Sequence, residues 1–200
     1  MTSPVPGRRR PLSRALIVAT ARRIADDDGL GALTVRQVAQ RLGTGQASLY
    51  RHITDRGQLL ALLAEDVAVR LPRCTDTGGP RERLREHWLA AHDHLARHPW
   101  AARIIADGEH AVDAAAPFAD GALAALAEAG LPPDEAARAY RALWNLLLGH
   151  LLNSHPVGHT STAHPQGGDP RADFAWALSR LLDGVLGGVL GGRQVGGRRV

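Results

Sequence analysis

The strongest constraint on the fold is a pair of short helical patterns separated by a glycine-containing turn. Thr34 and Gln37 form a capping-box pattern before a short apolar stripe that ends at Gly43. After Thr44 and Gly45, a second short pattern covers residues 46–52. Helices of about two turns are unstable alone and need tertiary packing. The stretch therefore predicts a helix-turn-helix.

The remaining segments also have helical spacing. The 200 residues contain only 2 Phe and 2 Tyr, and no alternating strand pattern stands out. Gly and Pro clusters separate the segments. These features predict an all-α fold with an N-terminal three-helix helix-turn-helix domain and a larger C-terminal helical domain. The helices are expected at about residues 11–28, 34–42, 46–52, 55–71, 80–97, 99–105, 116–129, 134–152 and 170–186. Asp134 and Asp169 are expected to cap the last two helices, and Leu49 and Ile53 are expected to be core residues.

Charge divides the chain into parts of opposite sign. Residues 1–72 carry a net +5, residues 73–192 a net −4 and residues 193–200 a net +3, with Arg as the only basic residue besides His. A basic front on an acidic body suggests a polyanionic partner for the front. The alternative is that the arginines only make a small helical domain soluble.

Several classes of protein are disfavoured by missing features. A single cysteine, Cys74, rules out an internal disulfide framework, and no run of 18 apolar residues predicts a membrane span. No secretory leader pattern follows the basic start, so we expect a cytoplasmic protein without a membrane partner. The sequence contains no phosphate-binding loop, nucleophile elbow or zinc-protease motif. His94 and His98 are spaced i, i+4 but lack a third ligand, so neither a metal nor a cofactor is expected.

Residues 12–71 contain an ordered set of motifs: G-L-x-x-L-T-V-R, then V-A-Q-R-L-G at residues 38–43, then L-Y-x-H at residues 49–52, then a capped D-R-x-x-L-L at residues 55–60. This ordered set resembles the DNA-binding domain of the tetracycline-repressor (TetR) family of bacterial transcription regulators. The resemblance implies a homodimer that binds a palindromic operator in double-stranded DNA. It divides the chain into a basic arm (1–11), a DNA-binding domain (12–72), a ligand-binding and dimerisation domain (73–190) and a flexible tail (191–200).

The second helix of a helix-turn-helix presents its side chains to the major groove. Gln suits adenine, Ala a thymine methyl group, Ser several bases and Arg guanine. Arg36 matches a base-reading position of the family, and Arg56 stands where many members have Lys. The expected DNA-binding residues are Arg36, Gln46, Ala47, Ser48, Tyr50, Arg51, His52 and Arg56. Among these, Tyr50, His52 and Arg56 fit phosphate contacts better.

Two alternatives stay open in this domain, and one residue departs from the family pattern. The Tyr50 ring can simply pack on its neighbours. The Arg8–Arg10 run is either a solvated tail or an arm that follows the minor groove. Gly45 stands where relatives often have Ser or Thr, which are stronger helix caps.

Two roles are expected for the acidic body. Tryptophans on its helices suggest a small-molecule pocket lined by Trp88, His92, Trp100 and Trp144, although the same residues can simply fill a core. The two long helices near the end are apolar over more than one face, which predicts a four-helix dimer interface, or else a monomer core. The expected interface residues are Trp144, Leu148, Leu151, Leu178, Leu182 and Val185.

The combined interpretation is a ligand-responsive repressor that an unidentified small-molecule inducer releases from DNA. The alternatives are a transcriptional activator, a ligand-independent regulator, or an all-α enzyme or carrier that has kept the helical body. The role of the C-terminal Arg/Gly tail is unassigned.

Overall fold

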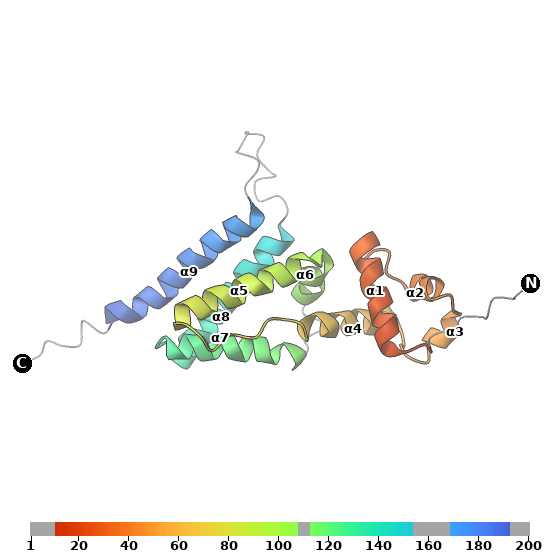
Figure 1. Cartoon of the computed structure of the whole chain (residues 1–200), viewed down its shortest axis with the longest axis horizontal. Helices are drawn as coiled ribbons and strands as arrows, with labels where there is room; N and C mark the ends of the chain where they lie inside the picture. Colours follow the sequence, from red (N-terminus) through yellow and green to blue (C-terminus); the bar gives the residue numbers. More distant parts are fainter. Residues whose placement is uncertain (1–10, 108–112, 154–168, 193–200) are drawn as a thin grey trace, which may run out of the picture. The chain divides into compact units, whose positions relative to one another are not determined.

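The computed structural model describes residues 11–107, 113–153 and 169–192, with side chains of the last helix described up to residue 187 (Figure 1). The described residues contain helices and no strand, which confirms the all-α prediction. The elements are α1 (Arg14–Asp28), α2 (Val35–Arg41), α3 (Gln46–Leu49), α4 (Arg56–Ala68), α5 (Pro80–Ala96), α6 (Pro99–Ala106), the short 3-10 helix η1 (Asp113–Ala115), α7 (Ala116–Glu128), α8 (Pro133–Leu152) and α9 (Pro170–Gly192).

The chain divides into two compact units. The first ends at Leu63 and the second begins at Ala64, so the division falls inside α4. The sequence placed the boundary at residues 72 and 73, where Pro72 ends the helical pattern. The difference arises because the last turn of α4 packs with the body: His94 of α5 donates a hydrogen bond from Nε2 to the Val67 carbonyl at 3.2 Å.

The first unit is built by capped helices around a small apolar core. The Ser13 hydroxyl accepts a hydrogen bond from the Leu16 amide at 3.3 Å, so α1 begins at Arg14 and not at residue 11. The Thr34 hydroxyl accepts from the Gln37 amide at 3.1 Å, which confirms the predicted cap of α2. The fully buried members of the core include Ile17, Ala21, Ile24, Leu33, Val38 and Leu49.

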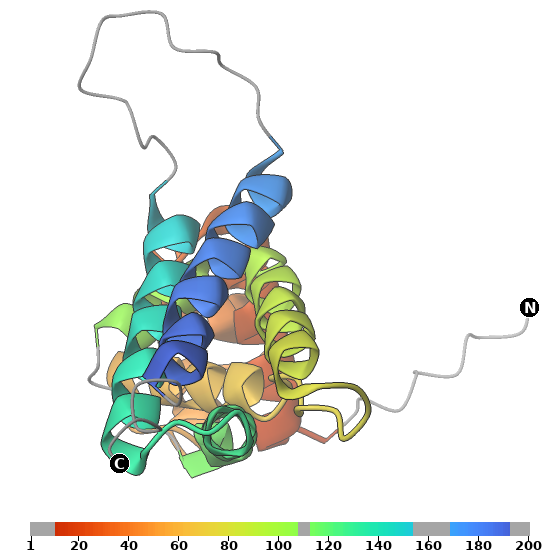
Figure 2. The same cartoon turned by 90° about the vertical axis from the view of Figure 1, so that its left-hand side faces the viewer.

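In the second unit, α5 packs against α7, α8 and α9, and α6 packs against α8. Figure 2 shows α5, α8 and α9 side by side. The buried core includes Leu84, Trp88, Phe118, Leu143, Leu147, Phe174, Leu178 and Leu182. Ion pairs tie α5 to its neighbours at the surface, as where Arg171 donates to both carboxylate oxygens of Asp93 at 2.7 and 2.9 Å.

The ends of the long helices differ in part from expectation. The predicted cap Asp134 lies inside the first turn of α8, which starts at Pro133 with Pro132 as its N-cap residue. Proline suits the first position of a helix, here Pro133, because its φ angle is already helical. The predicted cap of α9 is confirmed, since the Asp169 carboxylate accepts from the Arg171 amide at 3.0 Å. However, α9 continues to Gly192 and thus includes residues 191–192, which the sequence assigned to the tail.

Within the described ranges, no helix combines the length and apolar composition that crossing a membrane requires.

Candidate functional site

The turn between α2 and α3 is built around Gly43. Gly43 has φ of +62°, a left-handed conformation that favours glycine. Its amide donates to the Gln40 carbonyl at 3.1 Å, and the Thr44 amide donates to the Ala39 carbonyl at 3.0 Å. These two bonds form a Schellman motif, which closes the end of α2 and turns the chain into α3.

We call residues 46–52 the recognition segment. Its regular helix is shorter than predicted, because α3 covers only Gln46–Leu49. Helical hydrogen bonding nevertheless continues past it: the Tyr50 amide donates to the Gln46 carbonyl at 3.1 Å, and the Ile53 amide to the Leu49 carbonyl at 3.0 Å. Gly45 precedes α3 without a side-chain cap. Because the local cap is weak, packing has to hold this segment in place.

Two side chains anchor the recognition segment in the core. Leu49 is 0% exposed and Ile53 is 1% exposed, as expected for core residues. On the opposite side, Gln46, Ala47 and Arg51 are exposed, and the Tyr50 side chain is 53% exposed. This exposure places the Tyr50 ring largely in solvent. Ser48 and His52 are half-buried. The segment thus has one face for the core and one that is open to a partner.

Two arginines near this face have charge to offer a partner. Arg36 is exposed in the first turn of α2, and neither it nor Arg51 forms an ion pair with another described residue. In contrast, Arg41 is bound by α1, since its Nη2 lies 2.8 Å from the Asp28 carboxylate. Exposed guanidinium groups without protein partners suit phosphate or base contacts.

Arg56, the first residue of α4, has a structural role that the sequence did not reveal. Its Nε donates to the Leu33 carbonyl at 2.9 Å and its Nη2 to the Leu30 carbonyl at 3.0 Å. Both carbonyls belong to the connection between α1 and α2. Guanidinium carries five N–H donors, and the clamp uses two of the N–H groups of Arg56.

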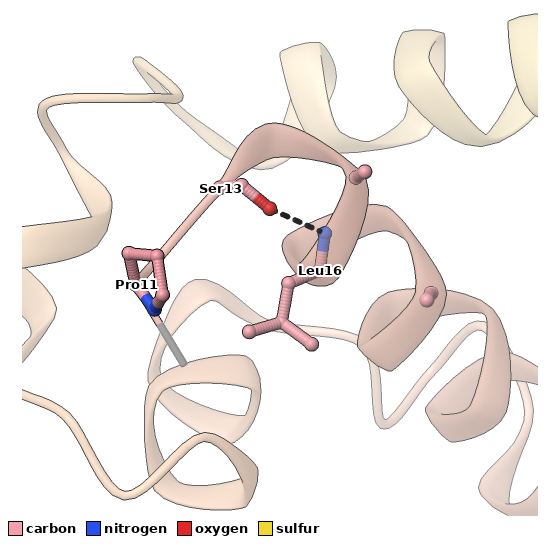
Figure 3. A pocket seen from close by; sticks show the side chains of 5 residues that line it. Pro11, Ser13 and Leu16 are labelled. Carbon is pink, nitrogen blue, oxygen red and sulfur yellow. Dashed lines mark hydrogen bonds between the residues drawn. The ribbon is translucent and has the colours of Figure 1, made fainter. Parts of the chain in front are cut away.

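A shallow depression lies beside the start of α1 (Figure 3). It is lined by Pro11, Ser13, Ala15, Leu16 and Ala19, and the hydrogen bond between Ser13 and Leu16 crosses it. Pro11 and Ser13 precede α1, and Ala15, Leu16 and Ala19 lie in its first two turns. None of these five described residues carries a charge.

In the second unit, five rings from α5, α7 and α8 form a group that we call the aromatic cluster: His87, Trp88, Phe118, Tyr140 and Trp144. The Trp88 ring lies with its centroid 5.1 Å from that of Phe118, 5.7 Å from Tyr140 and 6.2 Å from Trp144. Trp88 is 0% exposed, and its Nε1 has no hydrogen-bond partner among the described residues. Tyr140 and Trp144 are half-buried and form the rim of the cluster.

The aromatic cluster is electrically neutral at neutral pH. Burial lowers the pKa of His87 below its ordinary value of 6.5, and burial raises the pKa of Tyr140 above 10.0. The His87 Nε2 lies 3.0 Å from the Phe118 carbonyl, which can only accept, so this nitrogen carries the proton of a neutral ring.

The structure brings together only two of the four predicted ligand residues, Trp88 and Trp144. His92 lies elsewhere, stacked on Phe174 with ring centroids 4.6 Å apart, and Trp100 lies beside His98 at 5.6 Å. The prediction missed Phe118, Tyr140 and His87. Tyr140 precedes Trp144 by four residues on α8, so helical periodicity contained the signal for it.

The predicted dimer residues also need correction. Leu178 and Leu182 are 0% exposed and belong to the protomer core, so they are not available to a second subunit. Trp144 belongs to the aromatic cluster. Leu148, Leu151 and Val185 are half-buried. Among the described side chains of α8 and α9, the large apolar ones that are exposed are Leu152 at 39% and Trp176 at 68%. The apolar periodicity of α9 identified the face that the protomer itself buries.

No group of three or more potential metal ligands occurs in the part of the chain that the structure describes.

An all-α chain with an N-terminal helix-turn-helix and a separate helical body has the architecture of a transcription regulator that joins DNA binding and regulation in one polypeptide. Comparison with known families agrees. Residues 17–63 match the family of bacterial regulatory proteins of the tetR type, and residues 71–178 match the tetracyclin repressor-like C-terminal domain. The protein belongs to the TetR family.

Curated relatives match parts of the chain. The HTH-type transcriptional repressor DrrR1 of Streptomyces coeruleorubidus is 34% identical over 109 residues, which is 50% of this chain and 38% of DrrR1. An HTH-type transcriptional regulator of Saccharopolyspora erythraea is 32% identical over 144 residues, which is 69% of this chain and 59% of the relative. The match therefore spans less than two thirds of either relative.

Solved structures match nearly the whole chain. Apo ActR from Streptomyces coelicolor has a TM-score of 0.74 at 26% identity, with 90% of this chain and 97% of that chain covered. A TetR variant from Acinetobacter baumannii, crystallised with minocycline, has a TM-score of 0.71 at 26% identity, with 86% and 96% covered. The fold of the body is thus shared with proteins of the same family.

Proposed function

We propose that the protein is a transcriptional repressor in the cytoplasm, and not an enzyme. In this proposal a homodimer binds a palindromic operator in double-stranded DNA and a small-molecule effector releases it. The observation that carries the proposal is the recognition segment. Its buried Leu49 and Ile53 fix a face on which Gln46, Ala47 and Arg51 are exposed, and Arg36 of α2 is exposed as well.

The side chains on this face suit the reading of bases. Gln46 can form a bidentate pair with adenine, the Ala47 methyl can contact thymine, and Ser48 can bond several bases. Arg36 and Arg51 are free of acidic partners in the described part of the chain and can bind guanine or phosphate. Tyr50, His52 and Arg56 remain candidates for phosphate contacts, with the clamp of Arg56 limiting which of its N–H groups are available.

We expect a dimer because one short recognition segment contacts only a few bases. Two protomers related by two-fold symmetry bind two half-sites, which together form a palindrome. Exposed residues on α8 and α9 support an interface with a second copy of the chain. Trp176 and Leu152 are exposed there, and Gly149 and Gly184 have open space where a Cβ would stand, which allows a partner helix to approach closely. Leu148, Leu151 and Val185 complete the proposed interface.

The body supplies the proposed effector site through the aromatic cluster, of which Trp88 and Trp144 were expected. ActR of Streptomyces coelicolor, which shares this fold at 26% identity, has been crystallised with (S)-DNPA. An effector shifts the dimer away from DNA only if it binds one conformation more tightly than the other. The sign of regulation rests on the name of DrrR1, a repressor.

Selection of bound duplexes from a random double-stranded pool tests the proposal. The expected product is an inverted repeat with half-site centres about one helical turn, or a multiple of it, apart. A Gly43→Val variant, which should disrupt the turn before α3, is the matched negative control and should enrich no sequence. Absence of enrichment by the unmodified protein at low salt would contradict the proposal.

A further inference from the structure

The aromatic cluster contains a polar group whose hydrogen-bonding capacity is unused. The Trp88 indole is fully buried, and Nε1 finds no acceptor among the described residues. Leaving a buried donor unmatched is unfavourable. The indole N–H of Trp88 is therefore a donor that a partner from outside the chain can satisfy.

The surroundings of this donor define the shape of that partner. Rings of Phe118, Tyr140 and Trp144 lie with centroids 5.1–6.2 Å from the Trp88 ring, so the neighbouring surfaces are flat and apolar. Tyr140 and Trp144 are the half-buried members, one helical turn apart on α8, and their planes differ by only 12°. These two rings are the part of the cluster that is open to solvent, and flat rings favour stacking with a planar aromatic group.

The charge of the cluster defines the polarity of the partner. The indole N–H is a donor only, so it selects an acceptor atom. His87 uses Nε2 on the Phe118 carbonyl, and its Nδ1, an acceptor in this tautomer, is a second buried atom without a partner among the described residues. No ring of the cluster carries a formal charge. One turn before His87, Arg83 forms an ion pair with Glu128, so this cation is already neutralised. An anionic partner would therefore lose hydration without gaining a counter-charge.

We infer that the aromatic cluster binds an uncharged, planar aromatic effector whose carbonyl oxygen accepts a hydrogen bond from Nε1 of Trp88. The inference rests on the proposed effector role of the body, and it names the chemical class of the molecule. Trp88 selects the acceptor, while Phe118, Tyr140 and Trp144 select the ring.

Three related probes test the inference without DNA. These are 9-fluorenone, fluorene, which lacks the carbonyl, and 9-fluorenone-2-carboxylate, which adds a negative charge. In equilibrium dialysis the full-length protein should bind fluorenone at least about tenfold more tightly than fluorene. It should bind the carboxylate more weakly than fluorenone. Trp88→Phe should reduce the preference for fluorenone over fluorene to less than about twofold, whereas Trp100→Phe, outside the cluster, should retain it.

A second measurement on the unmodified sequence guards against a folding defect in Trp88→Phe. With 15N-labelled tryptophan, the four tryptophans give four indole N–H signals, assigned by single Trp→Phe variants. Fluorenone should shift the Trp88 signal downfield, and fluorene should not. The inference is overturned if neither neutral probe binds or if both bind equally. It is also overturned if fluorenone and fluorene shift the Trp88 indole signal by the same amount. Release of the selected operator duplex is measured separately. Trp88-dependent binding without release supports the inference and contradicts the proposed effector role.

Discussion

The guanidinium of Arg56 holds the carbonyl of Leu33 at 2.9 Å across 23 residues of sequence, and it holds Leu30 in the same way at 3.0 Å. The bond joins the start of α4 to the connection between α1 and α2. The family resemblance assigned Arg56 to DNA contact. The structure shows that its side chain also stabilises the domain that carries the recognition segment.

Arg56→Lys separates the observed clamp from the proposed phosphate contact of this residue. An ammonium group keeps the positive charge but cannot reach two carbonyls in the same forked geometry. We expect the free energy of unfolding to fall by about 1–2 kcal/mol, with the slope of log K against log salt for DNA unchanged. Arg56→Ala should also lower that slope by about 1 if the residue contacts a phosphate. Urea denaturation and fluorescence anisotropy measure the two effects.

Arg51→Lys is the matched control, since Arg51 is exposed without an ion pair in the described residues. Its stability should change by less than about 0.5 kcal/mol. Equal stability of Arg56→Lys and the unmodified protein would show that the clamp contributes nothing.

Arg36→Ala should relax sequence preference. If Arg36 binds a guanine edge, its loss costs about 1–3 kcal/mol on the selected operator and much less on a scrambled duplex of the same length. Titration of both duplexes at one salt concentration measures the difference. An equal loss on the two duplexes would instead identify Arg36 as a phosphate contact.

Trp176→Ala should weaken the dimer and leave the protomer fold intact. The side chain is 68% exposed in the single chain and is large enough to dominate an interface. Sedimentation velocity at micromolar concentration should show a shift toward monomer, with unchanged helical circular dichroism. The comparison variant is Leu178→Ala, whose side chain is fully buried in the protomer core. It should lower stability by about 2–5 kcal/mol while folded molecules remain dimeric. The reverse pattern would restore Leu178 to the interface and remove Trp176 from it.

Acid should destabilise the body through its buried histidines. Burial lowers the pKa of His94 below its ordinary value of 6.5, and the nearby Arg97, His98 and Arg70 add to this effect. A histidine with a lowered pKa in the folded state binds protons more readily when unfolded. The contribution of neutral His94 to the free energy of unfolding is therefore fully present above about pH 6.5, the ordinary pKa of histidine. This contribution is lost as the pH falls below that value.

His94→Gln tests this assignment, because the Gln amide can still donate to the Val67 carbonyl but does not titrate in this range. The variant should lose less stability than the unmodified protein between pH 7 and pH 5 in chemical denaturation. Identical pH dependence of the two proteins would mean that His94 does not contribute.

The features that sequence reasoning predicted correctly are mostly local. Thr34 capping α2, Asp169 capping α9 and Leu49 facing the core each depend on a few neighbouring residues and on helical period. Gly43 as the turn residue belongs with them, because a left-handed backbone strongly favours glycine.

The features that it missed depend on contacts between distant segments. Arg56 reaches carbonyls 23 and 26 residues away, which no spacing rule reveals. His92 and Trp88 lie one turn apart on α5, yet His92 stacks on Phe174 of α9 while Trp88 contacts Phe118 of α7. Leu178 was assigned to the interface and Trp176 was given no role, because α9 has two apolar faces and only packing against α5 and α8 decides which one is buried.

The most direct test of the account is the affinity of the dimer for its selected inverted repeat and for a scrambled duplex at physiological salt. The unmodified protein should prefer the inverted repeat by about 10³-fold or more, with two protomers per duplex. Gln46→Ala should lower affinity for the repeat by about 1–3 kcal/mol while affinity for the scrambled duplex stays nearly constant. Equal affinity of the unmodified protein for the two duplexes, or an equal loss on both for Gln46→Ala, would contradict base reading by the recognition segment.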